Sequence, residues 1–251
     1  MPKVSHAFVS AIADGGDTTL VGPTTWNASH VILGLTYKST KILTSLASAT
    51  YTAPASLGGL FIQMWGPGGG GAGASSSALS AAAGSSGGGG GYMNIFIGTS
   101  SVTSAYDYKC GTGGTGGAAG SNPGVAGTTT WMRDAGGVTF SAFGGVGGVA
   151  MTVNTTAASS AGGVGGSTSN GSFSVTGETG GNGIRFSGTV ALTKQGGGAA
   201  YAPGEPGEGG PTVGATAAGY AFGGGGACVV SSSNARGGDG GPGLIWIDEY
   251  Y

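Results

Sequence analysis

Residues 49–73, ATYTAPASLGGLFIQMWGPGGGGAG, join two kinds of sequence and decide the fold class. The first part, up to Trp65, is rich in β-branched and aromatic residues, which favour strands. From Gly66 the chain turns abruptly into a glycine run. The same elements return in reverse order near residue 251, where GGDGGPG precedes LIWIDEYY. The sequence therefore predicts a framework of strands that holds glycine-rich excursions.

Glycine dominates the composition, with 61 of the 251 residues, whereas only 7% of the residues are charged. Glycine loses more backbone entropy on folding than any other residue, so this composition by itself favours disorder. However, the chain also contains 4 Trp, 9 Tyr and 8 Phe and has a formal net charge of -2. Disordered chains are typically charged and poor in aromatic residues. We therefore expect an ordered fold with one domain and a small appendage.

The charge, hydropathy and cysteine patterns disfavour several protein classes. A net charge of -2 offers no basic surface for nucleic acid. No apolar run approaches the roughly 20 residues of a membrane span, and the segment MPKVSHAFVSAIADGGD does not have the pattern of a signal peptide. Cys110 and Cys228 lie far apart in the sequence. We expect them to be small buried hydrophobic residues, an interpretation favoured over a disulfide or a metal site.

The two parts of the chain differ in composition. Residues 1–36 contain few glycines and both histidines, and we expect them to form a small N-terminal arm for attachment or oligomerisation. Residues 37–251 are expected to form an all-β domain, a short-strand β-sandwich or barrel-like fold with long glycine-rich loops. Within one such loop, SALSAAA (residues 77–83) predicts a single helical turn. Strands are expected at residues 41–47, 50–53, 60–65, 92–98, 104–110, 128–132, 138–143, 149–153, 172–176, 184–186, 189–193, 227–230 and 244–250.

Some glycines recur at every third position. Period three is the repeat of an extended polyproline-II-type helix, which makes no internal hydrogen bonds. A glycine-lined face would let such helices approach and bond one another laterally, as polyglycine-II helices. The alternative is that a chain with this much glycine shows such spacings by chance. The three sets are Gly114, Gly117 and Gly120, then Gly204, Gly207 and Gly210, and then Gly237, Gly240 and Gly243.

Catalytic and cofactor motifs find little support in the sequence. The only histidines, His6 and His30, lie in the arm, where a hydrogen-bonding role is favoured over a metal site. The carboxylates are scattered, and Asp248 and Glu249 are expected to point to opposite faces of a strand. Glycine runs produce G-x-G-x-x-G matches freely, and no Walker-type phosphate loop is present. We expect no enzyme activity, no cofactor and no metal.

Aromatic residues set among glycines are the candidate binding residues. In antibody paratopes, Tyr and Trp give a large contact area at low entropic cost, while Gly and Ser give an adaptable backbone. Aromatic faces also stack on sugar rings. The alternative is that these rings fill a thin core. Tyr201 and Tyr220 are preferred because their neighbours are small, and the complete set is Trp131, Phe143, Tyr201, Tyr220 and Phe222.

Three stretches resemble the glycine-rich domain of bacteriophage tail-fibre and receptor-binding (adhesin) proteins. Residues 51–54 match the family's Y-T-x-P strand, and residues 60–71 match its apolar strand ending in W-G-x-G-G-G-G. Residues 238–251 match its final G-x-G-x-P-G followed by an apolar strand and an aromatic terminus. The string DGGDTTLVGPTTWNASHVI is also similar to a leader found on phage structural proteins.

The resemblance implies a virion protein that is assembled in the host cytoplasm and displays its glycine-rich loops to the host surface. It also implies a homotrimer, joined to a tail or baseplate protein by the N-terminal arm. A host polysaccharide or an outer-membrane protein would be the receptor. Trimerisation has independent support, because a chain with few large residues often needs partners to bury enough surface. The alternatives are a head fibre or decoration protein with a purely structural role, and a glycan depolymerase.

Overall fold

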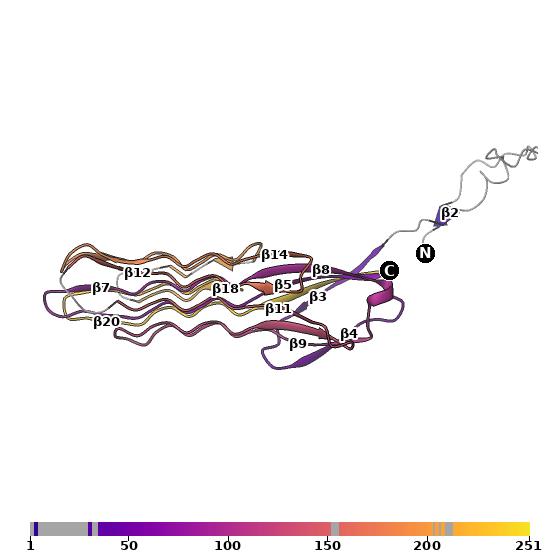
Figure 1. Cartoon of the computed structure of the whole chain (residues 1–251), viewed down its shortest axis with the longest axis horizontal. Helices are drawn as coiled ribbons and strands as arrows, with labels where there is room; N and C mark the ends of the chain where they lie inside the picture. Colours follow the sequence, from indigo (N-terminus) through magenta and orange to yellow (C-terminus); the bar gives the residue numbers. More distant parts are fainter. Residues whose placement is uncertain are drawn as a thin grey trace, which may run out of the picture.

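The computed structural model describes residues 3–4, 30–31, 35–151, 156–202, 204–205, 207–208 and 213–251. The described chain is all-β, as predicted, and its single helical element is the 3₁₀ turn η1 (Thr99–Ser101). Strands gather at the end that holds the C-terminus, and long wavy segments run from them to the opposite end (Figure 1). The described part of the chain contains no helix that is long and apolar enough to cross a membrane.

Two five-stranded antiparallel sheets form a β-sandwich. None of the sheets in the described part of the chain closes into a barrel. The first sheet, called the β5 sheet, has the order β14 (Phe173–Val175), β8 (Tyr92–Gly98), β5 (Gly59–Trp65), β21 (Leu244–Tyr250) and β3 (Tyr37–Leu43). The second, called the β10 sheet, has the order β13 (Thr168–Ser169), β11 (Thr139–Ala142), β10 (Thr130–Asp134), β9 (Ala105–Lys109) and β4 (Ala49–Thr52).

The core of the sandwich follows from strand alternation. Successive side chains of a strand point to opposite faces, so every second residue of β5 faces inward. Leu60, Ile62 and Met64 are accordingly fully buried. They belong to one apolar cluster with Tyr106 and Met132 of the β10 sheet. The apolar sides of the two sheets therefore pack against each other.

Glu249 is buried between the sheets, although it is ionisable. The hydroxyl of Tyr51, on the β10 sheet, donates to its Oε1 at 2.7 Å, and the Ser39 hydroxyl donates to its Oε2. Burial acts to raise the pKa of Glu249, but these hydrogen bonds and the charges of Lys41 and Lys38 outweigh it and lower the pKa below its usual value. The carboxylate thus links the two sheets.

The remaining strands are short. They are β1 (Lys3–Val4), β2 (His30–Val31), β6 (Ala74–Ser75), β7 (Ala81–Ala83), β12 (Ala158–Ser160), β15 (Gly183–Arg185), β16 (Ala191–Leu192), β17 (Gly204–Glu205), β18 (Ala218–Gly219), β19 (Cys228–Val230) and β20 (Asn234–Ala235). The arm predicted for residues 1–36 lies outside the described residues, apart from β1, β2 and residues 35–36, and so does His6.

Two local predictions were wrong. The expected helical turn at residues 77–83 is a single hydrogen-bonded turn at residues 78–79 followed by β7, because the fully buried alanines of β7 pair with β19. The expected strand at residues 149–153 is absent from residues 149–151, and residues 152–155 lie outside the described residues. Val149 instead accepts a hydrogen bond from the Ser85 amide, as part of the glycine-rich arrangement described next.

The glycine-rich segments bond to one another laterally with a period of three residues. Within residues 66–73, the amides of Gly66, Gly69 and Ala72 all donate to carbonyls of residues 85–91. The amides of Gly68 and Gly71 donate to carbonyls of residues 238–241. The amides of Gly70 and Gly73 donate to carbonyls of residues 122–125. This is the hydrogen bonding expected of polyproline-II-type helices packed side by side.

Three such segments are enclosed on all sides. Residues 66–73 donate to three segments and accept from three others, residues 111–117, 143–149 and 221–227. Residues 84–91 and 221–227 likewise each have six bonded neighbours, and the three inner segments bond to one another. We call the whole arrangement the glycine bundle. Its outer segments are residues 111–117, 122–128, 143–149, 161–166, 177–181, 193–198, 207–208, 214–217 and 236–243.

The packing of the bundle explains the glycines. A Cβ on Gly70 would lie 2.1 Å from the Thr115 carbonyl oxygen, and a Cβ on Gly87 would lie 2.1 Å from that of Gly69. In the outer segments, one position of each triplet faces solvent and carries a side chain, as at Val146 and Val149. Inner segments therefore carry small residues at almost every position, with Pro67 and Phe222 next to the sandwich as exceptions, while outer segments need glycine only where they face a neighbour.

We predict that Gly70→Ala lowers the free energy of unfolding by at least about 4 kcal/mol or prevents folding. The added methyl group cannot avoid the backbone of residue 115 without separating two segments. Gly98→Ala is the matched control, because the nearest atom to its Cβ would lie 3.9 Å away, and we expect a change within about 1 kcal/mol. Chemical denaturation followed by circular dichroism measures both. Equal stability of the two variants would contradict the bundle packing.

Candidate functional site

The end of the molecule opposite the sandwich consists of turns between bundle segments. We call residues 76–80, 118–121, 186–190 and 231–233 the distal tip. Strands β7 and β20, which follow two of these turns, lie with β12 at the far end from the C-terminus (Figure 1). Polyproline-II geometry rises about 3.1 Å per residue, so the eight residues 66–73 separate the tip from the sandwich by about 25 Å.

Apolar side chains are exposed at the distal tip. Leu79 is 79% exposed and Phe186 is 55% exposed, and Val190 and Val230 beside them are also exposed. Backbone bonds join two of the turns, from the Ser231 amide to the Ser80 carbonyl and from the Ser232 amide to the Ser77 carbonyl. Apolar contacts and serine hydroxyls are therefore presented together.

The tip also contains strained backbone and lacks charge. Ser231 and Ser232 have φ values of 55° and 56°, in the left-handed region that non-glycine residues rarely occupy. Both are exposed. The turn sequences SSALS, AAGS, FSGTV and SSS contain no charged residue. An uncharged surface of hydroxyl and apolar groups is suited to contact with a protein or a saccharide rather than with a polyanion.

Trp131 and Phe143, two of the predicted site residues, lie far from this tip. Trp131 is half-buried near the start of β10, where its register partners are Lys109 and Ser141. Phe143 is 40% exposed at the start of the outer segment 143–149, next to the sandwich. The structure does not bring these two residues together with the others.

Tyr201 and Tyr220 gather where the bundle meets the β5 sheet. The Tyr201 ring is 74% exposed and lies 5.2 Å from the Tyr92 ring. Tyr220 is half-buried and packs against the buried cluster that contains Tyr92 and Trp65. Phe222 is only 7% exposed, so its ring offers no contact surface in this conformation.

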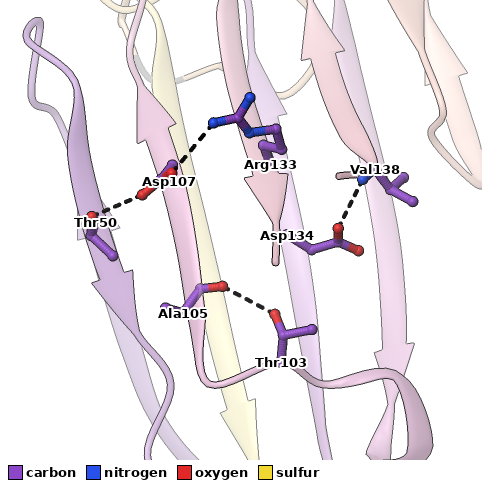
Figure 2. Close-up of polar contacts among 7 residues, drawn as sticks. All are labelled: Thr50, Thr103, Ala105, Asp107, Arg133, Asp134 and Val138. Atoms are coloured by element: carbon purple, nitrogen blue, oxygen red, sulfur yellow. Dashed lines mark hydrogen bonds and ion pairs between the residues drawn. The ribbon is translucent and has the colours of Figure 1, made fainter. Parts of the chain in front are cut away.

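Several carboxylates of the described residues make hydrogen bonds within the fold. On the outer face of the β10 sheet, Asp107 accepts from the Thr50 hydroxyl at 2.9 Å and lies 3.5 Å from Arg133 (Figure 2). Both charged groups are about half exposed, and such a pair contributes little stability. The neighbouring Asp134 accepts from the Val138 amide at 2.8 Å and caps the turn (Figure 2). These contacts stabilise strands and a hairpin.

The cysteines behave as predicted. Cys110 and Cys228 are both buried and free. Burial raises the pKa of the Cys110 thiol to about 11, which makes a reactive thiolate scarce at neutral pH. Among the described residues, no group of three or more His, Cys, Asp or Glu side chains is arranged to hold a metal ion.

No family model matches the chain, and no curated protein matches it.

The residues of the distal tip are absent from the predicted set of binding residues, because that set was chosen for aromatic rings beside glycine runs. One feature of the sequence could have indicated the tip. Leu79 and Val230 are apolar residues next to serines, where a turn and therefore an exposed position is expected. Only the bundle topology places these separate turns at one end.

Proposed function

We propose that the protein is a phage virion adhesin, a tail-fibre or tail-tip component that binds the host cell surface through the turns of its distal tip. The observation that carries this proposal is the exposed, uncharged, partly apolar tip, held about 25 Å from the sandwich by a backbone-bonded bundle. Soluble proteins rarely expose contiguous apolar patches unless these bind something. The receptor would be a surface polysaccharide or an outer-membrane protein.

The opposite end of the molecule supports an attachment role. The last residue of the N-terminal arm lies beside the C-terminus, since Thr36 and Tyr251 exchange two backbone hydrogen bonds. The arm would therefore leave the molecule at the end farthest from the tip. In this proposal, residues 1–36 connect the protein to a tail or baseplate protein, and the tip faces away from the virion.

The rival assignments make different demands on the tip. A head fibre or decoration protein with a purely structural role would need no receptor contact there. A glycan depolymerase would need a pair of carboxylates facing a bound sugar, whereas three of the described carboxylates, Asp107, Asp134 and Glu249, bond within the fold. The adhesin assignment uses the exposed apolar tip, which the rivals leave without a role.

The proposed homotrimer would be assembled through the sandwich. The inner bundle segments find all their bonded neighbours within one chain. Exposed apolar side chains on the β5 sheet, among them Tyr37, Ile42 and Phe96, offer a surface for other copies. Three copies would present each tip contact three times and raise avidity.

The adhesin proposal predicts that labelled full-length protein stains cells of at least one strain in a bacterial panel, measured by flow cytometry. Leu79→Asp places a charge in the tip, and Val230→Asp places one directly beside it, at the end of β19. Both should reduce staining about tenfold or more. Because both positions are exposed, their unfolding free energies should change by less than about 0.5 kcal/mol.

Val164→Asp is the matched control for this experiment, because Val164 is a similarly exposed valine on the side of the bundle. It should stain cells as the wild type does. Equal staining by the tip variants and the control would exclude the tip as the receptor site. Failure of the wild type to stain any strain would instead favour the decoration protein.

The trimer proposal predicts a particle of three times the chain mass of 23.6 kDa in light scattering of the purified protein. Ile42→Asp, which places a charge on the proposed contact surface, should shift the particle towards the single-chain mass. A wild-type protein that stays at the single-chain mass at all concentrations tested would rule out a stable homotrimer.

A further inference from the structure

We propose that the aromatic cluster around Tyr201, where the bundle meets the β5 sheet, is a second binding site, for a neutral saccharide. It lies on the flank of the molecule, at the opposite end of the bundle from the distal tip. The proposal does not depend on receptor binding by the tip. It rests on exposed rings, uncommitted amide groups and a strained turn.

The rings are arranged around Tyr92. Tyr201 lies 5.2 Å from Tyr92 at an interplanar angle of 62°, and Phe173 lies 6.3 Å from it at 67°. Tyr92 itself is buried, whereas Tyr201 is 74% exposed and Phe173 is 47% exposed. Two exposed rings thus stand at steep angles to a buried one. Exposed aromatic rings of this kind provide apolar faces for the C–H groups of a sugar ring.

Amide side chains lie beside the rings. Gln63, Asn94 and Phe173 occupy one cross-strand row of the β5 sheet. The Tyr92 hydroxyl donates to Gln63 Oε1 at 2.9 Å and accepts from Asn94 Nδ2 at 3.3 Å. This leaves the side-chain NH₂ group of Gln63 and the side-chain oxygen Oδ1 of Asn94 without a hydrogen bond within the described part of the chain. They can donate to and accept from sugar hydroxyls.

The turn that carries Tyr201 is strained and fixed in place. Tyr201 has a φ of 54°, which is unfavourable for any residue with a Cβ. The indole Nε1 of the buried Trp65 donates to the Ala200 carbonyl at 2.8 Å and fixes the turn. Glycine at this position would relieve the strain, yet the chain has a tyrosine whose ring is mostly in solvent. Strain of this kind is concentrated at binding sites.

The chemistry of the site selects the ligand class. The groups that surround the exposed rings are phenol, amide and aliphatic groups, and none of the contacts described above involves a charged side chain. An acidic glycan would need an Arg or Lys to offset its carboxylates or sulfates. Uncharged hexose or N-acetylhexosamine units fit a site of aromatic faces and amides.

The test uses the full-length protein and an array of neutral oligosaccharides of hexoses and N-acetylhexosamines, with sialylated and sulfated oligosaccharides as the acidic set. We expect the wild type to bind neutral members. Tyr201→Gly should weaken that binding at least about tenfold, while its melting temperature stays equal to or above that of the wild type. Glycine accepts the left-handed turn, so a loss of binding without a loss of stability identifies the ring as a ligand contact.

Phe173→Ser is the second variant and keeps the test decisive if Tyr201→Gly misfolds, because it should weaken the same binding. Val125→Ser, at an exposed position of the outer segment 122–128 that belongs to neither the proposed trimer surface nor the ring cluster, should bind like the wild type. Leu79→Asp should also bind the array like the wild type, which separates this site from the proposed tip. Absence of neutral binding, binding to acidic members alone, or unchanged binding by both Tyr201→Gly and Phe173→Ser would overturn the proposal.

Discussion

Lateral hydrogen bonds between glycine backbones are the interaction on which the structure depends. An extended segment of period three has no internal hydrogen bonds, so each of its amides and carbonyls must find a partner in another segment. A buried backbone group left without a partner costs about 1–3 kcal/mol. Residues 66–73, 84–91 and 221–227 meet this requirement by bonding to six neighbours each. Glycine at most of their positions lets the backbones approach closely, which is why the composition that suggests disorder produces an ordered bundle.

The sandwich and the bundle have complementary roles. Large side chains such as Leu60, Met64 and Ile247 form an apolar core that fixes the starting positions of several bundle segments. Strand β5 leads directly into residues 66–73, and residues 84–91 lead directly into β8. Because β5 and β8 are paired, these two inner segments start in register. The bundle then fixes the positions of the turns at the distal tip, where no apolar core comparable to that of the sandwich is present. In the proposed adhesin these turns contact the receptor.

Much of the fold could be predicted from the sequence, because strand alternation is a local signal. The alternation in β5 and β21 identified the buried faces, including the opposite orientations of Asp248 and Glu249. The period-three glycines indicated extended rods, but the partners of a rod include segments more than a hundred residues away, as for Gly69 and Gly224. Among the candidate site residues, Tyr201 is exposed and Phe222 is buried, although both lie beside small residues. That difference arises from the packing of whole segments and has no local signal.

Amide hydrogen exchange measured by NMR tests the bundle most directly. The amides of Gly69, Gly70 and Gly71 donate to three different segments, at Gly88, Val125 and Gly238. If the bundle is present in solution, these three amides exchange as slowly as that of Ile62 in the middle of the sandwich. Exchange of all three at the rate of an unstructured peptide, while Ile62 stays protected, would show that the glycine runs are free loops and would contradict the account.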